Sequence, residues 1–257
     1  MFFDSHCHLD RIDLTEYNNN FSELVSRSRE AKVSKMICIG VDLDSFEAMH
    51  LKILKEQDVY CSVGVHPDYQ QVTEPTVEML TELAVKEKVV AIGETGLDYK
   101  HAGENHDWQQ KRFQIHIEAA RQSHLPLIIH TRDARKDTIQ LMKNKNADEV
   151  GGVLHCFTEN WEMARQAIEM GFYISISGIV TFKQAESIRE MAKKIPDDRL
   201  LIETDSPWLS PAPFRGKTNF PGRVALVAET LAKIRHCSVE HIAQVSHDNA
   251  CQLFNIH

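Results

Sequence analysis

The stretch KMICIGVDLDSFEAMHLKILKEQDVYCSVGVH, residues 35–66, contains the structural unit that the rest of the chain repeats. Its two ends, Lys35–Val41 and Val59–His66, are continuous apolar runs of strand length, which are typical of strands buried on both faces. The segment between them, Ser45–Gln57, places apolar residues at helical spacing. A helix that connects two buried strands predicts that the strands are parallel.

Strand-like runs of this kind recur along the whole chain, and their starts lie 21 to 37 residues apart, the length of a strand–helix–strand unit. The eight runs are Phe2–Leu9, Lys35–Val41, Val59–His66, Val89–Glu94, Pro126–Thr131, Gly151–Phe157, Phe172–Ser177 and Leu200–Asp205. Two further helices, Arg223–His236 and Val239–Phe254, follow the last run. Eight units predict an α/β fold, a single (β/α)8 TIM-type barrel with extra C-terminal helices. A doubly wound open sheet is the competing fold, but no G-x-G-x-x-G motif follows the first run.

Composition limits the class of protein. We find no linker or low-complexity stretch, so residues 1–257 are expected to form one domain. The start of the chain lacks a signal peptide and no window is apolar enough for a membrane span, which predicts a cytoplasmic protein without membrane contact. Six scattered cysteines without a CxxC pair predict reduced thiols. A net charge of −8 excludes a uniformly basic coat, so any contact with nucleic acid must be local.

Residues that commonly bind metals are concentrated at the carboxyl ends of the predicted strands. Five of the fourteen histidines lie there, and Glu94 and Asp205 end the fourth and eighth strands. In a parallel barrel these ends share one rim, where enzymes of this fold carry their chemistry. Side chains alternate along a strand, so His6 and His8 should point to the same side and Cys7 away from it. The histidines are His6, His8, His66, His130 and His155.

This set of residues is larger than a single catalytic zinc ion requires, since such an ion takes three protein ligands. We therefore expect two divalent ions, Mg²⁺, Mn²⁺ or Zn²⁺, with Glu94 as the carboxylate that bridges them. Asp205 would complete one ion together with the first two histidines, and the other ion would take His130 and His155. The predicted ligands are His6, His8, Glu94, His130, His155 and Asp205.

Six motifs spread over nearly the whole chain resemble the TatD family of metal-dependent deoxyribonucleases. They are DSHCHLD (4–10), GETGLDY (93–99), IIHTRDA (128–134), LHCF (154–157), ETDSPWL (203–209) and RGKTNFP (215–221). The resemblance implies a metal-centred TIM barrel that hydrolyses phosphodiesters through a metal-bound hydroxide, typically as a 3′-to-5′ exonuclease on single-stranded DNA, and it implies the same six ligands. A glutamate at the fourth strand, where many small-molecule amidohydrolases use a modified lysine, favours phosphodiesters as substrates.

Two alternatives remain open at this point. The first is an amidohydrolase that acts on a small ester, lactone or amide, and the second is a scaffold that keeps metal only for stability. The expected catalytic residues are Asp205, Glu94 and His66. Asp205 either accepts the proton of the attacking water as well as binding metal or serves as a ligand alone, and Glu94 bridges the ions. His66 contacts the scissile phosphate or the leaving oxygen, or makes only a structural hydrogen bond. Glu203 either supports the metal ligands, binds substrate or fills a polar layer of the barrel.

Cations and aromatic residues near the motifs suggest how a polyanion would be held. Arg132, Arg215 and Lys217 are expected to bind phosphate, although most loop cations are only solvated. Because the protein is acidic overall, the expected partner is an end of single-stranded DNA or RNA rather than a coated duplex, and no obligate protein partner is expected. Four aromatic residues could stack on bases or pack in the core, namely Tyr99, Phe157, Trp208 and Phe220.

Overall fold

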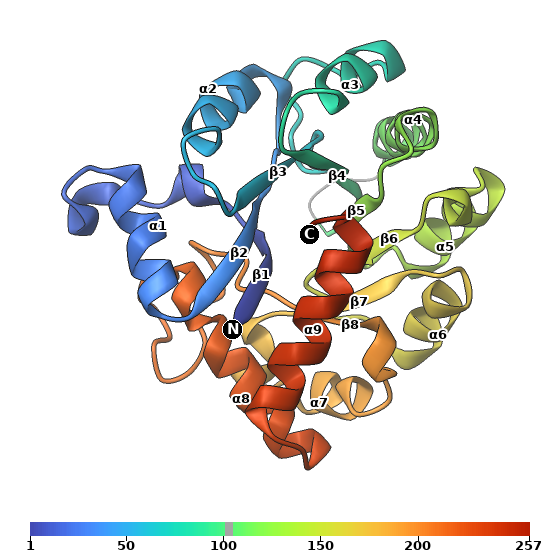
Figure 1. Ribbon diagram of the computed structural model, residues 1–257. Helices are drawn as coiled ribbons and strands as arrows, with labels where there is room; N and C mark the ends of the chain where they lie inside the picture. Colours follow the sequence, from blue (N-terminus) through green and yellow to red (C-terminus); the bar gives the residue numbers. More distant parts are fainter. Residues whose placement is uncertain (101–104) are drawn as a thin grey trace.

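The computed structural model describes residues 1–100 and 105–257, and its eight parallel strands pair in chain order to form a barrel surrounded by helices (Figure 1). The strands are β1 (Phe2–Cys7), β2 (Val33–Cys38), β3 (Val59–Val63), β4 (Val89–Asp98), β5 (Leu127–Arg132), β6 (Gly152–Leu154), β7 (Tyr173–Ile176) and β8 (Leu200–Ile202). The helices are α1 (Phe21–Glu30), α2 (Leu43–Ile53), α3 (Val77–Ala84), α4 (Asp107–Ser123), α5 (Arg135–Asn144), α6 (Trp161–Glu169), α7 (Glu186–Ala192), α8 (Val224–Arg235) and α9 (Val239–Phe254). The predicted TIM-type barrel with C-terminal helices is confirmed.

Polar groups join β1 to β8 and close the barrel. The carboxylate of Asp4 accepts hydrogen bonds from the backbone N–H of Thr204 at 2.9 Å and from its hydroxyl at 2.5 Å. The hydroxyl of Ser5 donates to the carbonyl of Ile202 at 2.9 Å, and the N–H of Asp205 donates to the carbonyl of His6 at 2.9 Å. The first and last strands are therefore fixed together next to two of the predicted metal ligands.

Two strands contain a bulge at the point where they supply a predicted ligand. On β1, Asp4 pairs with Met36 and Cys7 with Cys38, so three steps along β1 match two along β2. On β4, Ile92 pairs with Leu127 and Thr95 with Ile129, which gives the same mismatch against β5. A bulge redirects the side chains around it, and here the residues concerned are His6 and Glu94.

The bulge in β4 depends on Gly93. This residue has a φ of +142°, a backbone conformation that residues with a side chain rarely adopt. A Cβ atom there would also lie 2.5 Å from the carbonyl oxygen of Ile128. A larger residue would push β4 away from β5, because the contact is with backbone that has no room to move. The glycine therefore permits the close approach of the two strands beside Glu94.

One strand boundary differs from the expectation in a way that matters for the site. We expected β4 to end at Glu94, but pairing with β5 continues past the bulge through Gly96 and Leu97 to Asp98. Glu94 consequently lies inside the strand, and Asp98 is the residue that ends it. Several other strands end earlier than expected, so that His8, His66, His155 and Asp205 lie in the loops that immediately follow them.

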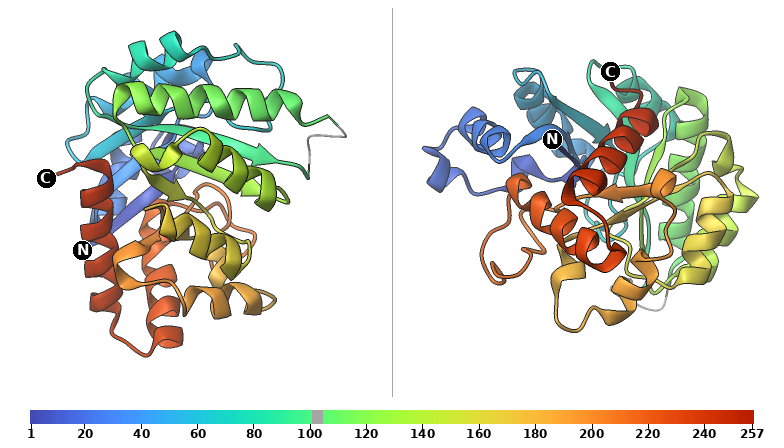
Figure 2. Two further views of the ribbon diagram at one scale, coloured as in Figure 1. Left: turned by 90° about the vertical axis from the view of Figure 1, so that its right-hand side faces the viewer. Right: turned by 60° about the horizontal axis from the view of Figure 1, so that its bottom comes forward.

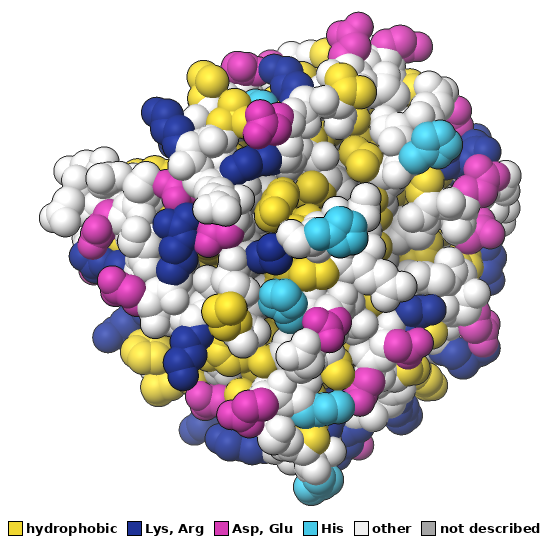
Figure 3. All heavy atoms as spheres, viewed as in Figure 1, with side chains coloured by type: hydrophobic (Ala, Val, Ile, Leu, Met, Phe, Trp, Pro, Cys, Tyr) yellow, Lys and Arg dark blue, Asp and Glu magenta, His cyan; other side chains and the backbone are white. Residues whose placement is uncertain are grey.

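The two ends of the barrel are built differently. At the N-terminal end Phe3, Ile128 and Leu201 form an apolar cluster with Ala250 and Phe254 of α9. Figure 1 shows α9 lying across this end, and the left view of Figure 2 shows it along one edge of the molecule together with both termini. The same face in Figure 3 mixes charged and apolar side chains with no gathering of one kind. No helix in the described residues is long and apolar enough to span a membrane.

Candidate metal centre

A cavity of about 540 Å³ lies at the opposite, C-terminal end of the barrel, where the chemistry was expected. Its lining includes five of the six predicted ligands, all except His6, which lies deeper. His66, Tyr69, Arg132 and Trp208 also line it. Side chains from β4 and β5 and from the loops after β1, β3, β6 and β8 thus converge on one space.

The first group of potential ligands surrounds one oxygen of Glu94. His6 Nε2 and His8 Nε2 lie 3.2 Å apart, so both rings point to the same side as alternation predicted. Asp205 Oδ1 lies 3.6 Å from the first of these nitrogens and 3.3 Å from the second. Glu94 Oε2 lies 3.5 Å and 3.8 Å from the same two nitrogens. Four donor atoms therefore surround one point.

The second group surrounds the other oxygen of the same carboxylate. Glu94 Oε1 lies 2.7 Å from His155 Nε2 and 3.2 Å from His130 Nδ1, and these two nitrogens are 3.4 Å apart. His66 Nε2 lies 3.3 Å from the same oxygen. Glu94 therefore stands between two groups, with one oxygen directed at each.

These spacings fit divalent ions. With metal–ligand bonds of about 2.0–2.2 Å, neighbouring donor atoms of a tetrahedral site lie about 3.3–3.6 Å apart. Octahedral sites with similar bonds have closer donors, near about 3 Å. The measured separations of 2.7–3.8 Å cover this range. Imidazole nitrogens and carboxylate oxygens are donors that Zn²⁺ and Mn²⁺ accept readily. The residues present therefore fit the divalent ions expected from the sequence.

The electrostatics of the site also favour bound positive charge. Burial raises the pKa of Glu94, but His155 and His66 outweigh it and hold this pKa well below its usual value. Burial lowers the pKa of His155, yet Glu94 and Glu203 bring it well above its usual value. Two buried carboxylates thus stabilise a cation at this position, and a metal ion would satisfy them as a proton does.

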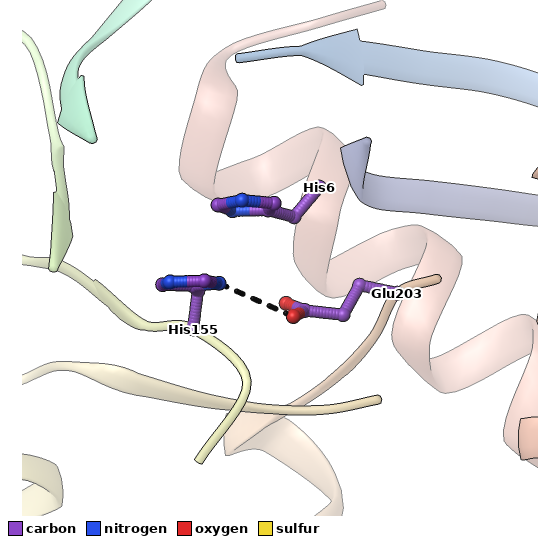
Figure 4. A group of neighbouring side chains, drawn as sticks. All are labelled: His6, His155 and Glu203. Carbon is purple, nitrogen blue, oxygen red and sulfur yellow. Dashed lines mark hydrogen bonds and ion pairs between the residues drawn. The ribbon is translucent and has the colours of Figure 1, made fainter. Parts of the chain in front are cut away.

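Glu203 lies behind the cavity rather than in its wall. It is fully buried, and Oε1 accepts a hydrogen bond from the N–H of Cys156 at 2.9 Å and lies 3.3 Å from His155 Nδ1. Figure 4 shows the His155 ring directed at Glu203, with the ring of His6 stacked on it at a centroid distance of 3.8 Å. This arrangement turns His155 Nε2 towards Glu94. Of the roles considered for Glu203, it fits support of a metal ligand.

Asp98 stands to His130 as Glu203 stands to His155, and it was not among the site residues predicted from the sequence. Its Oδ2 lies 3.1 Å from His130 Nε2, while His130 Nδ1 faces Glu94. A proton held on Nε2 by this carboxylate leaves the lone pair of Nδ1 free for a metal. The missed signal lay in the GETGLDY motif, because ending the fourth strand at Glu94 left Asp98 in a loop.

The predicted substrate contacts divide into two groups. Arg132 and His66 line the cavity, as a role at the substrate requires. Arg215 and Lys217 are exposed on the loop after β8 and do not line it. The guanidinium of Arg215 lies 3.5 Å from the centre of the Phe182 ring. The structure therefore brings two of the four basic or histidine contacts to the site.

Of the four aromatic residues considered, only Trp208 is both exposed and in the cavity wall. Half of its surface is exposed, and its ring meets His8 edge-on at a centroid distance of 4.9 Å. Phe157 is buried in the core, and Tyr99 stacks on His106 at 3.6 Å and hydrogen-bonds to Asp137. Phe220 packs against the core and carries Arg223 over its ring.

Comparison with known proteins adds family information. A family model described as TatD related DNase matches residues 3–255. The chain is 44% identical over 254 residues to the uncharacterized metal-dependent hydrolase YcfH of Escherichia coli strain K12, covering 98% of this chain and 95% of that protein. It is 42% identical to the uncharacterized metal-dependent hydrolase YabD of Bacillus subtilis, over the full length of both.

Among solved structures, the crystal structure of YJJV, a TatD homologue from Escherichia coli K12, matches with a TM-score of 0.89 and 28% identity. It covers 100% of this chain and 98% of the other. A TatD family hydrolase from Entamoeba histolytica matches with a TM-score of 0.85 at 23% identity, a likeness of fold. The barrel architecture and its family are thus supported independently of the site geometry.

Proposed function

Because this chain belongs to the TatD related DNase family and is a metal-dependent hydrolase, we propose that it cleaves phosphodiester bonds of DNA as a 3′-to-5′ exonuclease on single strands. RNA ends are the second polymer to which the proposal extends. The cofactors would be two divalent ions, Mg²⁺, Mn²⁺ or Zn²⁺, held by the six predicted ligands.

The observation that carries the proposal is the division of the Glu94 carboxylate. Oε2 faces His6 and His8, which Asp205 also approaches, whereas Oε1 faces His130 and His155. A carboxylate placed between two ligand groups is suited to bridge two ions. Two ions in one site suit an in-line displacement at phosphorus, where both the attacking and the leaving oxygen carry charge.

The chain's own residues would divide the work around that centre. Divalent ions bound here would supply a hydroxide nucleophile at neutral pH and offset negative charge on the substrate. Asp205 is partly open to the cavity and can accept the proton of an attacking water. Arg132 and His66 would hold the phosphate, since a guanidinium matches phosphate oxygens well. Trp208 would stack on an unpaired base.

A second candidate is hydrolysis of a small ester, lactone or amide. Its support is that Arg215 and Lys217 do not line the cavity and that Val41, Ile179 and Leu209 do. A volume of about 540 Å³ is also typical of small-molecule sites. The presence of Arg132 in the wall and a glutamate at the bridging position argue for the phosphodiester.

The test uses single-stranded DNA labelled at its 5′ end, incubated with the purified protein and Mg²⁺ or Mn²⁺. The expected result is a ladder of products that shorten from the 3′ end, lost with a chelator and lost in D205N. RNA of the same sequence, run in parallel, measures the preference between the two polymers. Hydrolysis of a small ester or lactone without any metal-dependent ladder would overturn the nuclease proposal in favour of the second candidate.

A further inference from the structure

A groove of about 520 Å³ runs along the outside of the barrel between α5 and α6. The two helices pack against each other and lie side by side, facing the viewer in the left view of Figure 2. Its basic lining residues, Arg135, Lys136 and Lys143, all come from α5. In a protein with a net charge of −8, three basic residues in one groove mark a local preference for anions.

The free charge in this groove is carried by two lysines. Arg135 is paired with the buried carboxylate of Glu159, and the acidic lining residue Glu162 is paired with Arg165. Lys136 is exposed and makes no ion pair within the described residues. The ammonium of Lys143 donates to the amide oxygen of Gln166 at 3.0 Å and lies near enough to Glu162 to help lower the pKa of that carboxyl. Lys136 and Lys143 are seven residues apart on one helix, so they share a face about 10 Å apart along its axis.

The groove begins where the wall of the metal cavity ends. Arg132, the last residue of β5, lines the cavity, and Arg135, the first residue of α5, lines the groove. In the loop after β6, Thr158 lines the cavity and Asn160 the groove. Two residues of chain span at most about 7 Å and three about 10 Å, so the two linings are close neighbours. A strand leaving the cavity across these two segments, which the Arg135–Glu159 ion pair joins, would therefore reach the groove next.

We propose that the α5–α6 groove binds the part of a single-stranded nucleic acid that remains outside the metal cavity, with Lys136 and Lys143 on its phosphates. This proposal rests on the proposed exonuclease function, because removal of nucleotides from the 3′ end leaves the 5′ portion of the strand to exit. Two lysines about 10 Å apart on one helix can contact two different phosphates of the same extended strand. The groove therefore selects polymers over isolated nucleotide esters.

The test compares a dinucleotide, which the cavity holds alone, with an oligonucleotide of about eight nucleotides, which reaches the groove. In the wild type the longer substrate should have the lower KM. The double variant K136Q/K143Q should raise KM for the longer substrate by about 5-fold per lost contact near 0.1 M salt. The slope of log KM against log salt concentration should become shallower by about 0.7 per lost contact. Dinucleotide kinetics should stay unchanged.

The matched control is K55Q/K233Q, which removes the same charge from two exposed lysines away from the groove, one in the turn after α2 and one on α8. It should leave both substrates unaffected. The groove proposal would be overturned if the control and groove variants had equal effects, or if the wild type had equal KM values for the two substrate lengths. Either result would leave the nuclease proposal standing. Absence of metal-dependent cleavage of the dinucleotide as well as the longer strand would overturn both. Thermal unfolding of each variant checks that surface substitution has left the fold intact.

Discussion

At the N-terminal end of the barrel Phe3, Ile128 and Leu201 fill the interior with apolar atoms, and Phe254 of α9 covers them. At the C-terminal end the same barrel buries His6, Glu94 and Glu203. Burial of these polar groups does not stabilise the fold, because they lose their hydrogen bonds to water. Between the two lies a thin polar layer in which Ser5 contacts Ser175 across 3.3 Å. The N-terminal end therefore contributes to the stability of the fold, whereas burial of charged groups at the C-terminal end lowers that stability.

The largest effect should come from removing the carboxylate shared by the two ligand groups. E94Q keeps the size of the side chain but loses the negative charge, so both groups lose a ligand and both ions should be lost or greatly weakened. Hydrolysis should fall by about 10⁴-fold, equivalent to about 5 kcal/mol of barrier. Metal content by elemental analysis should fall with it, and the metal-free variant should unfold at a lower temperature than the metal-free wild type, because buried His155 loses the carboxylate paired with it. Full metal content in E94Q would contradict the bridging geometry.

The opposite result is expected at the other end of the barrel. F254A removes a side chain that is 3% exposed and leaves a cavity under α9, which should lower the free energy of unfolding by about 3–5 kcal/mol. Activity per folded molecule and metal content should not change, because the site lies at the other end of the strands. Urea unfolding measures the loss. The control L51A, at a position 54% exposed, should change stability by less than about 0.5 kcal/mol. Lost metal binding in F254A would show that the two ends are not separable.

The comparison also explains which features could be predicted from the sequence. Strand-length apolar runs and their spacing predicted the barrel, and the histidines and carboxylates at the ends of those runs predicted which residues meet at the C-terminal end. The bulges in β1 and β4 were not predictable, because each depends on backbone pairing with a neighbouring strand, as between Ile92, Thr95 and β5. For that reason Glu94 was placed at a strand end and Asp98 was missed. Exposed loop cations such as Lys217 were equally hard to place, since nothing in their spacing reports which way the loop folds.

Histidine count was also a poor guide to chemistry, as His116 of α4 illustrates. This residue is fully buried away from the cavity: Nδ1–H donates to the carbonyl of Arg112 at 2.8 Å, and Nε2 accepts from the N–H of Val65 at 3.0 Å. Burial lowers its pKa from 6.5 to about 4. The unfolded chain therefore binds a proton that the folded chain does not between these two pH values, so stability rises with pH across this window and falls on acidification.

This residue should account for about 3 kcal/mol of the acid destabilisation, since each unit of pKa corresponds to about 1.36 kcal/mol. H116Q retains an acceptor for Val65 but does not titrate. Its free energy of unfolding should therefore depend less on pH between about 4 and 6.5 than that of the wild type. Denaturant unfolding at a series of pH values measures the difference. Identical pH profiles for the two proteins would rule out this role for His116.

The smallest expected effect separates ligands from the residues that orient them. Asp98 holds a proton on His130 Nε2 and so presents Nδ1 to the site, and partners of this kind typically contribute 10–100-fold to metal affinity. D98N can still accept a hydrogen bond but no longer stabilises charge on the imidazole, so metal affinity should fall within that range while the fold is retained. Metal titration by calorimetry measures it, with D133N at an exposed position nearby as the control. Because Glu94 and His155 remain in the second group, the weakened ion should recover at higher metal concentration, which distinguishes an orienting residue from the shared ligand lost in E94Q.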